Sequence, residues 1–480
     1  MVNNPLKWIS INNQEVMDAN CRLEANVFNV DARAAFNILN HCRYPLAKLC
    51  GTKSLAKAHH FGRFKRVFVD KSEMPIYQPS QILDINPKPE KFISSKTQTD
   101  IESLRVVRDQ ILMTCSGTIG KCTIVSKTLD NKIFSHDLLR IEAIEKADTG
   151  YIYAYLKTKI GQSVLTTNNY GAVIQHIEPE HLQNVPIPNA PDSIKLSIHN
   201  KVMRSFALRD ESNELIAQAE KMMMEALHLP DIDSLHPDLY RKNAGVQTYS
   251  VQYDLLNDRF DASYHLPIVS KIIDCLLDSG ATILPMGDES LTNKIFLPLR
   301  FKRVYVDETY GKVFFGGKEL LELDPSGKKY LSTLIHNKRI EEQLLLRENM
   351  ILVTRSGTVG KVNIASKHWQ NWIANDHVLR VLSKSKENAG YLYIWLNSEY
   401  GKALVERFIY GSVVDEIEPE HLRILPIPIL SDASMMKTIN DLALQANALR
   451  SEAYYLEQAA IKQMEEEVIY VGGSVFKNEF

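Results

Sequence analysis

The sequence predicts an α/β (α+β) protein made of two tandem copies of one mixed α/β domain, each followed by a long helix. Three observations lead to this prediction. Sequence blocks recur in the same order half a chain apart, and each copy contains short β-rich runs bounded by Gly, Pro, Asn and Asp. Each copy then ends in a Pro-x-Pro that is followed by a helical pattern. The two helices are expected to pair as an antiparallel coiled coil.

The repeat is read directly from matched blocks. GTIGK begins at Gly117 and GTVGK at Gly357, 240 positions later, and IEPEHL recurs from Ile177 to Ile417 with the same offset. Upstream, RLEA at 22 matches RFDA at 259, and RFKRVFVD at 63 matches RFKRVYVD at 300, both with an offset of 237. YGAV at 170 matches YGSV at 410. Matched blocks in one order indicate duplication.

The expected domain organisation follows from the repeat. The ranges are 1–190 for the first mixed α/β domain, 191–229 for its spacer helix, 230–247 for a linker, 248–430 for the second mixed α/β domain, 431–470 for its spacer helix and 471–480 for a C-terminal tail. In each domain, runs such as ILMT, CTIV and LLRIEA predict strands, and GYIYAYLKTKIGQSVL predicts a helix.

Both spacer helices show the 3.5-residue repeat that is typical of a coiled-coil seam. The predicted seam of the second helix is Met435, Ile439, Leu442, Ala446, Leu449, Ala453, Leu456 and Ala460. The first helix fits less well, with Ile194, Ile198, Leu208, Leu215, Ala219, Met222 and Ala226 interrupted by Lys201, Ser205 and Ser212. The alternative, in which each helix lies only on its own domain, stays open.

Composition describes a cytoplasmic globular protein. Of 480 residues, 45% are hydrophobic and 24% charged, and no run of 18 apolar residues predicts a membrane span. The N-terminal stretch lacks the pattern of a secretory signal, and the six cysteines form no CxxC pair. The net charge of −2 neither demands nor excludes a nucleic-acid partner.

The glycine-rich loops SGTIGK and SGTVGK have two compatible interpretations. A P-loop requires GxxxxGK[ST], but Cys115 and Cys122 occupy its first and last positions in one copy, and Arg355 and Val362 do so in the other. Nucleotide binding is therefore not expected. The loops are either plain glycine turns between two strands or turns whose amides, hydroxyls and lysine also grip a DNA phosphate.

The repeated RFKRV run is either an ordinary charged strand face or a contact for the DNA backbone. The DNA-binding candidates from the two repeated motifs are Arg63, Lys65, Arg66, Ser116, Thr118 and Lys121 in the first copy, and Arg300, Lys302, Arg303, Ser356, Thr358 and Lys361 in the second.

No residue is predicted to be catalytic or to bind a metal, and no cofactor is expected. His176 and His181 are five apart around Pro179, which is not the spacing of a zinc helix, and Glu416 replaces His176 in the second copy. Glu-Pro-Glu is better explained as a helix start. The His and Asp of SHDLLRI and NDHVLRV are in opposite order, so a shared dyad is not expected. The sequence contains no methyltransferase tetrapeptide and no convincing nuclease array.

These blocks, taken together, resemble type I restriction–modification specificity (S) subunits. The resemblance rests on RFDA, GGKELLELDPSGKKYLS, ILVTRSGTVGKV and YGSVVDEIEPEHLRILPIPIL, with a weaker series in the first copy that includes YGAVIQHIEPEHLQNVPIP. It spans nearly the whole chain in the family's duplicated order. The first copy departs at MPIYQPSQILDINPKPEKFIS, which stands opposite GGKELLELDPSGKKYLS.

The resemblance implies a sequence-specific double-stranded DNA-binding subunit without enzyme activity. Its two target recognition domains would read a bipartite, asymmetric site, and its paired helices would act as a ruler. Two DNA methyltransferase subunits would be partners, and restriction subunits could join them. A helix from Met435 to Ala460 would span roughly 39 Å, or about 11 base pairs. The unlike stretches KTQTDIESLRVVR and STLIHNKRIEEQLLLR would read unlike half-sites.

Two alternatives stay open. The chain could be a specificity-like subunit of another phage-defence system, or a decoy for methyltransferase subunits. It could instead be a stand-alone DNA- or nucleotide-processing enzyme that uses the glycine loops.

Overall fold

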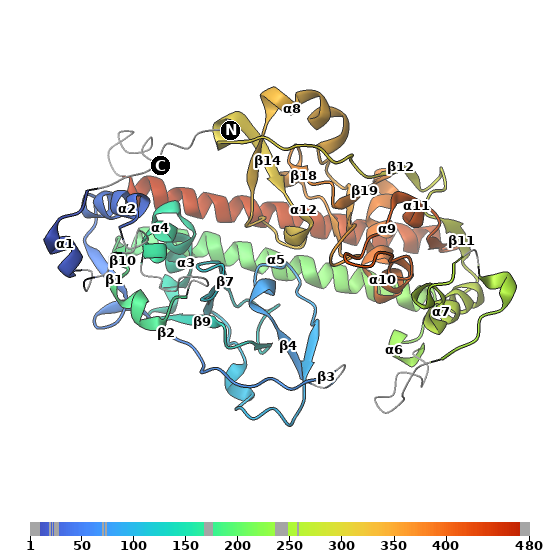
Figure 1. Cartoon of the computed structure of the whole chain (residues 1–480), viewed down its shortest axis with the longest axis horizontal. Helices are drawn as coiled ribbons and strands as arrows, with labels where there is room; N and C mark the ends of the chain where they lie inside the picture. Colours follow the sequence, from blue (N-terminus) through green and yellow to red (C-terminus); the bar gives the residue numbers. More distant parts are fainter. Residues whose placement is uncertain are drawn as a thin grey trace. The chain divides into compact units, whose positions relative to one another are not determined.

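The computed structural model describes residues 10–18, 21, 23, 28–69, 72, 74–167, 176–235, 248–256 and 259–470 (Figure 1). The predicted tail at 471–480, most of the predicted linker, the YGAV block and most of the RLEA block lie outside the described residues. The chain divides into two compact units. Unit 1 comprises Met1–Asp210 with Glu452–Phe480, and unit 2 comprises Glu211–Ser451.

Unit 1 is a mixed α/β body. Its strands are β1 (Leu46–Cys50), β2 (Ser54–His59), β3 (Phe68–Val69), β4 (Pro75–Tyr77), β5 (Lys91–Ile93), β6 (Ile111–Thr114), β7 (Cys122–Ile124), β8 (Ile133–Phe134), β9 (Leu138–Ala143) and β10 (Pro186–Pro188). Its helices are α1 (Asn13–Asp18), α2 (Val30–Asn40), α3 (Thr149–Lys157) and α4 (Lys159–Thr167), followed by α5 (Asp192–Ala226), which continues into unit 2.

Unit 2 repeats this plan. Its strands are β11 (Thr282–Pro285), β12 (Thr292–Phe296), β13 (Tyr305–Val306), β14 (Gly311–Phe315), β15 (Lys329–Ser332), β16 (Ile351–Thr354), β17 (Val362–Ile364), β18 (Ile373–Ala374), β19 (Val378–Ser383) and β20 (Pro426–Ile429). Its helices are α6 (Ile232–Leu235), α7 (Pro267–Asp278), α8 (Thr333–Arg339), α9 (Lys386–Asn397), α10 (Glu399–Glu406) and α11 (Pro419–Arg423), followed by α12 (Ala433–Gln463), which ends in unit 1.

Strand order confirms the duplication. Unit 1 contains a six-stranded sheet β10-β1-β2-β9-β6-β7 and a small sheet β3-β5-β4-β8. Unit 2 has the equivalent strands as β20-β11, β12-β19-β16-β17 and β13-β15-β14-β18. The one difference is that β1 and β2 pair in parallel, whereas β11 and β12 do not pair, so the large sheet of unit 2 is divided. The stretch in which the first copy departs from the repeat still supplies β4 and β5, the counterparts of β14 and β15.

Several local predictions are corrected by the structure. The RFKRV segments precede the strands β3 and β13 and are not themselves strands. The helical pattern that begins at Gly150 forms two helices, because Thr158 ends α3 and its Oγ1 accepts a hydrogen bond from the backbone N–H of Gly161 at 3.0 Å. The Glu-Pro-Glu helix start is confirmed, since Pro419 opens α11.

The two long helices run antiparallel to each other in both units. In unit 1, Ile198 and Val202 of α5 share a core with Ala460 of α12 and with Met464, which begins the π-helical turn Met464–Ile469 after α12. In unit 2, late residues of α5 share a core with early residues of α12, namely Ile216, Ala219 and Met223 with Ile439, Ala443 and Ala446. The mixed α/β class and the coiled-coil pairing are therefore as predicted.

The predicted seam of α12 is correct at every second position, because Ile439, Ala446, Ala453 and Ala460 are buried, but the predicted positions between them are one residue out of place. On α12 and the turn that follows it, the residues buried at steps of four and three are Ile439, Ala443, Ala446, Arg450, Ala453, Glu457, Ala460 and Met464. On α5 they are Ile198, Val202, Ser205, Ser212, Ile216, Ala219 and Met223, with the half-buried Arg209 between the serines. Leu442, Leu449 and Leu456 flank the seam. Charged and hydroxyl side chains at seam positions hid the pattern, because they are satisfied by partners that sequence does not show.

Glycines at the start of α3 and α9 let these helices approach the long helices closely. A Cβ on Gly390 would lie 2.3 Å from the backbone oxygen of Asn440, and one on Gly150 would lie 2.7 Å from the Cα of His199. The same neighbours accept hydrogen bonds from the glycine backbones. The backbone N–H of Gly390 donates to Asn440 Oδ1 at 2.8 Å, and that of Gly150 donates to His199 Nδ1 at 3.1 Å. This explains why the GYxY block recurs.

Candidate nucleic-acid interface

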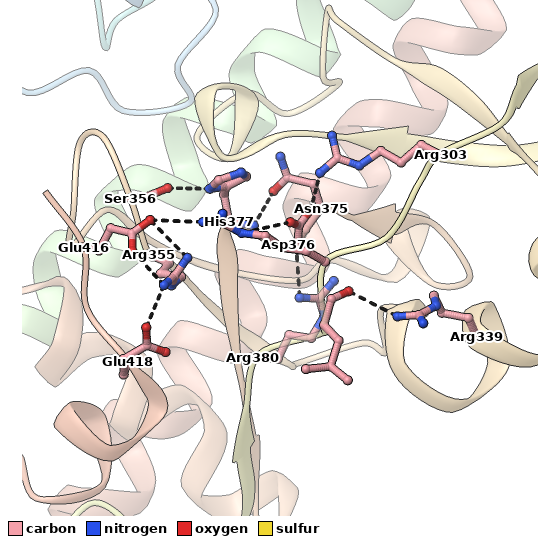
Figure 2. Close-up of polar contacts among 12 residues, drawn as sticks. Arg303, Arg339, Arg355, Ser356, Asn375, Asp376, His377, Arg380, Glu416 and Glu418 are labelled. Carbon is pink, nitrogen blue, oxygen red and sulfur yellow. Dashed lines mark hydrogen bonds and ion pairs between the residues drawn. The ribbon is translucent and has the colours of Figure 1, made fainter. Parts of the chain in front are cut away.

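Four repeated sequence blocks meet on one side of each unit. In unit 2 they are the RFKRV segment between β12 and β13, the glycine loop between β16 and β17, the NDHV turn between β18 and β19, and the residues that lead into α11. Figure 2 shows their polar side chains converging on Asp376, Glu416 and Glu418. Duplication preserved this meeting of blocks, because the equivalent strands of unit 1 bring together the equivalent blocks.

Both glycine loops are tight β-hairpin turns. In unit 2 the hydroxyl of Thr354 accepts the backbone N–H of Lys361 at 2.9 Å and donates to the carbonyl of Thr358 at 2.5 Å. Gly357 and Gly360 have φ values of +77° and +82°, which explains the choice of glycine. Thr114 makes the same two contacts in unit 1.

This geometry differs from that of a nucleotide-binding loop. A P-loop leads into a helix whose free amides cradle phosphates, whereas the lysine here leads directly into strand β7 or β17. The amides of Gly360 and Lys361 are already engaged within the turn. The glycine-turn interpretation is confirmed. Thr118 and Thr358 are exposed in their turns, and Lys121 and Lys361 are half-buried where the following strands begin.

The loop of unit 2 is fixed by Arg355, a buried residue that precedes Ser356. Its guanidinium donates to Glu416 at 3.2 and 2.8 Å and to Glu418 at 2.6 Å (Figure 2). Burial by itself would raise the pKa of Glu418, but hydrogen bonds from Tyr410 and Arg355 outweigh that effect and lower it. The Glu418 carboxylate therefore remains a charged acceptor at neutral pH.

Ser356 connects the loop to the NDHV turn. Its hydroxyl shares a hydrogen bond of 2.6 Å with Nδ1 of His377, and its backbone bridges to Glu416. Arg380 holds the conformation of the turn. It is fully buried, and its guanidinium donates to the carbonyls of Ala374 and Val378, each at 2.6 Å. Its counterpart Arg140 donates to the carbonyl of Leu104 at 2.9 Å.

The RFKRV segment supplies cations to the same place. Arg303 forms an ion pair with the buried carboxylate of Asp376, while Arg300 lies 3.3 Å from Glu416 and 4.0 Å from Asp376. The Arg300 side chain is 69% exposed, and Lys302 is exposed beside it. Of the predicted residues of unit 2, the structure thus gathers Arg300, Arg303 and Ser356 around shared acidic partners.

Unit 1 places different chemistry at the same positions. Arg66, the counterpart of Arg303, donates to the hydroxyl of Ser135 at 3.1 Å, and His136 lies 3.3 Å from Asp137. His60 pairs with Glu178. Arg63 and Lys65 are exposed, and Ser116 bridges to His176 as its counterpart does to Glu416.

The residue before Ser116 is a further contrast. Cys115 occupies the position of Arg355, and desolvation by burial is the largest of the effects that raise the pKa of its thiol to about 12. The thiol is therefore uncharged at neutral pH. Unit 1 thus has a neutral group where unit 2 has a guanidinium clamped by two carboxylates.

Sequence reasoning missed the roles of Arg355, Arg380 and Glu418. The recurrence of an arginine in the apolar strands LLRIEA and VLRVL was a usable signal for Arg380. The repeat gave no such signal for Arg355, because its counterpart in the first copy is Cys115.

The described part of the chain contains no group of three or more His, Cys, Asp or Glu that could hold a metal ion. Among the described residues, no helix has both the length and the apolar character needed to cross a bilayer.

Comparison with known proteins gives similarities only among solved structures. No protein-family model and no curated protein matches the chain. A type I restriction-modification system S subunit from M. genitalium is 11% identical, covering 88% of this chain and 96% of its own, with a TM-score of 0.35. The HsdS subunit from Thermoanaerobacter tengcongensis is 15% identical, covering 86% and 97%, with a TM-score of 0.26.

A third similar structure is described as showing complex assembly and conformational transition of the type I R-M system. It is 15% identical, covers 85% of this chain and 96% of its own, and has a TM-score of 0.26.

Proposed function

We propose that the chain is the non-catalytic specificity subunit of a type I restriction–modification complex. It binds a bipartite, asymmetric double-stranded DNA site and directs methyltransferase subunits, two per complex, and restriction subunits to that site. One observation supports this proposal above the others. The same four blocks meet in both units, exposed cations border each meeting point, and the polar groups at its centre differ between the units.

Exposure and charge indicate which side chains of each interface contact phosphates and which contact bases. Exposed cations such as Lys65, Lys302 and Arg300 are suited to phosphate contacts, which give affinity without sequence preference. The central groups present fixed donors and acceptors, which suits base edges. Hydrogen-bond acceptors predominate in unit 2, where Arg355 holds Glu416 and Glu418. In unit 1, His176 stands in place of Glu416 and His136 in place of Asp376. Two such surfaces read two unlike half-sites.

The paired helices set the distance between the half-sites. Their seams follow a 3.5-residue repeat, so insertion of seven residues into both helices preserves the packing. Each insertion lengthens its helix by roughly 10 Å, or about three base pairs. The gap between the two halves of the methylated motif should grow by that amount. An unchanged gap in a methylating complex would refute the ruler.

Methylation mapping tests the function itself. Deletion of the gene in its native host should erase one bipartite motif from a long-read methylation map, and the plasmid-borne gene should restore it. Exchange of residues 1–190 for the first domain of another specificity chain should change one half of that motif. A motif that survives deletion, or an exchange that alters both halves, contradicts the proposal.

A second experiment tests the alternative that the chain is a stand-alone enzyme. The purified chain, incubated with DNA, magnesium, ATP and a methyl donor, should turn over none of them. Hydrolysis or cleavage that disappears in a Ser356→Ala variant would favour a stand-alone enzyme instead.

A further inference from the structure

Helix α8 distinguishes unit 2 from unit 1. It lies between β15 and β16 and continues as a π-helical turn, Ile340–Leu344. In unit 1 the connection between β5 and β6, which is fully described, contains only a short 3-10 turn, Glu102–Leu104. The helix therefore stands where the two copies are least alike in sequence.

One side of α8 is anchored to the RFKRV segment. The backbone N–H of Val304 donates to Nε2 of His336 at 3.2 Å, and Arg339 donates to the carbonyl of Leu299 at 3.2 Å. The Arg339 guanidinium also lies 4.9 Å from the centre of the Phe301 ring. Figure 2 shows Arg339 at the edge of the polar network. The helix is thus tied to the segment that carries the exposed cations.

The other side of α8 is exposed. Leu334 is 92% exposed and Ile335 is 59% exposed, and Asn337 and Lys338 are exposed at helical spacing from Leu334. An aliphatic side chain left in water forgoes the free energy that its burial would contribute. Two adjacent ones on a helix that is otherwise well anchored indicate a surface that is covered in a complex.

The charge around this face favours DNA over an apolar protein surface. Within α8 the charged residues are Lys338 and Arg339, with no acid, and the segment to which it is anchored adds Arg300 and Lys302. The acidic pair Glu341 and Glu342 lies beyond the end of α8. The last turn of α8 is basic, and its exposed face of Leu, Asn and Lys matches the donors and apolar contacts that the major groove accepts.

We propose that α8 is a recognition helix that enters the major groove of the half-site read by unit 2. Leu334 contacts a thymine methyl group, Asn337 an adenine edge and Lys338 the N7 and O6 acceptors of guanine. Anchoring to the RFKRV segment lets phosphate contacts by Arg300 and Lys302 fix the depth and angle of the helix. This inference rests on the proposed function and adds the element that selects the bases of one half-site.

The test compares variants of the full-length chain in the native host after deletion of the chromosomal gene. Leu334→Ala, Asn337→Ala and Lys338→Ala are each mapped for methylated motifs by long-read sequencing. Leu277→Ala, at a side chain 65% exposed on α7, and Lys271→Ala on the same helix are matched controls. Each α8 variant should relax one position of one half of the motif, with methylation at mismatched sites raised roughly 5-fold or more.

The other half of the motif should not change, and the two α7 variants should reproduce the wild-type map. If all three α8 variants still discriminate against mismatched sites as well as the wild type does, the inference is overturned. A uniform loss of methylation without relaxation also overturns it, because that result indicates a protein partner or phosphates on this face. If the wild-type chain directs no bipartite motif, the proposed function fails as well. If it directs one that the α8 variants leave unrelaxed, only the inference about α8 fails.

Discussion

Glu457 is a buried carboxylate within the helix seam of unit 1. Only 1% of the residue is exposed, and it forms an ion pair with Arg209 of α5. Tyr153 of α3 donates its hydroxyl to Glu457 at 2.5 Å, and the Lys157 ammonium lies 3.5 Å away. Burial alone would raise the pKa of Glu457, but the two cations and the hydrogen bonds lower it from 4.5 to about 2. The contact joins α12, α5 and α3.

Glu457→Gln keeps the shape of the side chain and removes its charge. The lowered pKa corresponds to about 3 kcal/mol of stability at neutral pH. Loss of one partner of a buried ion pair costs about 3–5 kcal/mol, because the remaining cations lose their counter-charge. Arg209 and Lys157 retain some access to water, so we expect about 3 kcal/mol.

The effect has a defined dependence on pH. Because the folded-state pKa of Glu457 lies below its unfolded value, the stabilisation is complete above pH 4.5 and is lost as the pH falls toward 2. The difference between the wild type and Glu457→Gln should therefore be constant from pH 6 to 8, shrink below 4.5 and almost vanish near 2.

Hydrogen exchange on peptides from α3 measures this local stability within unit 1. Glu452→Gln, at an exposed position of the same helix, is the control and should change the opening free energy by less than about 0.5 kcal/mol. If Glu457→Gln behaves like Glu452→Gln at pH 7, or if its effect does not depend on pH, the ion-pair reasoning is wrong.

Three further outcomes are expected. Gly390→Ala should lower the free energy of unfolding of unit 2 by at least about 1–3 kcal/mol in thermal denaturation, whereas Gly357→Ala, whose Cβ meets open space, should cost only about 1 kcal/mol of backbone strain. Lys302→Ala should reduce the slope of log affinity against log salt by about 0.9 and weaken binding equally for all DNA sequences. Arg355→Leu should destabilise unit 2 by about 1.5–3 kcal/mol in denaturant unfolding, because two partly exposed carboxylates lose their shared cation, while Cys115→Ala in unit 1 should cost much less.

The duplicated framework could be predicted from the sequence because its signals are local. Glycines at positive φ, hairpin strands and a proline at a helix start depend on a few neighbouring residues, and they recur in both copies. The repeat also supplied long-range information. Because the same blocks occur in the same order in both copies, they belong to one duplicated fold. In each unit that fold brings the predicted basic and glycine motifs to one side.

The polar interior could not be predicted because its rationale lies between segments far apart in sequence. Arg450 and Glu457 occupy seam positions where a heptad pattern calls for apolar residues. Their partners Asn363, Tyr393, Tyr153 and Arg209 come from other helices and strands. The same holds for Arg355, whose two carboxylates follow it by about 60 positions. Helix α8 was also missed, since its unit 1 counterpart gave no helix to compare.

The two copies differ in a way that separates the framework from the interface. Positions that shape the fold keep their chemistry, as in the pairs Gly150 and Gly390, Arg140 and Arg380, and Thr114 and Thr354. Positions at the meeting of the blocks change theirs, as in Cys115 and Arg355, His136 and Asp376, and His176 and Glu416.

A chain that bound the same half-site twice would gain nothing from such changes, because each swaps the charge or the hydrogen-bonding capacity of a group at the interface. A chain that reads two different half-sites needs them, since a misplaced acceptor or donor at a base edge costs about 1–3 kcal/mol of discrimination. The contrast between a constant framework and altered central groups therefore favours an asymmetric target over a palindrome.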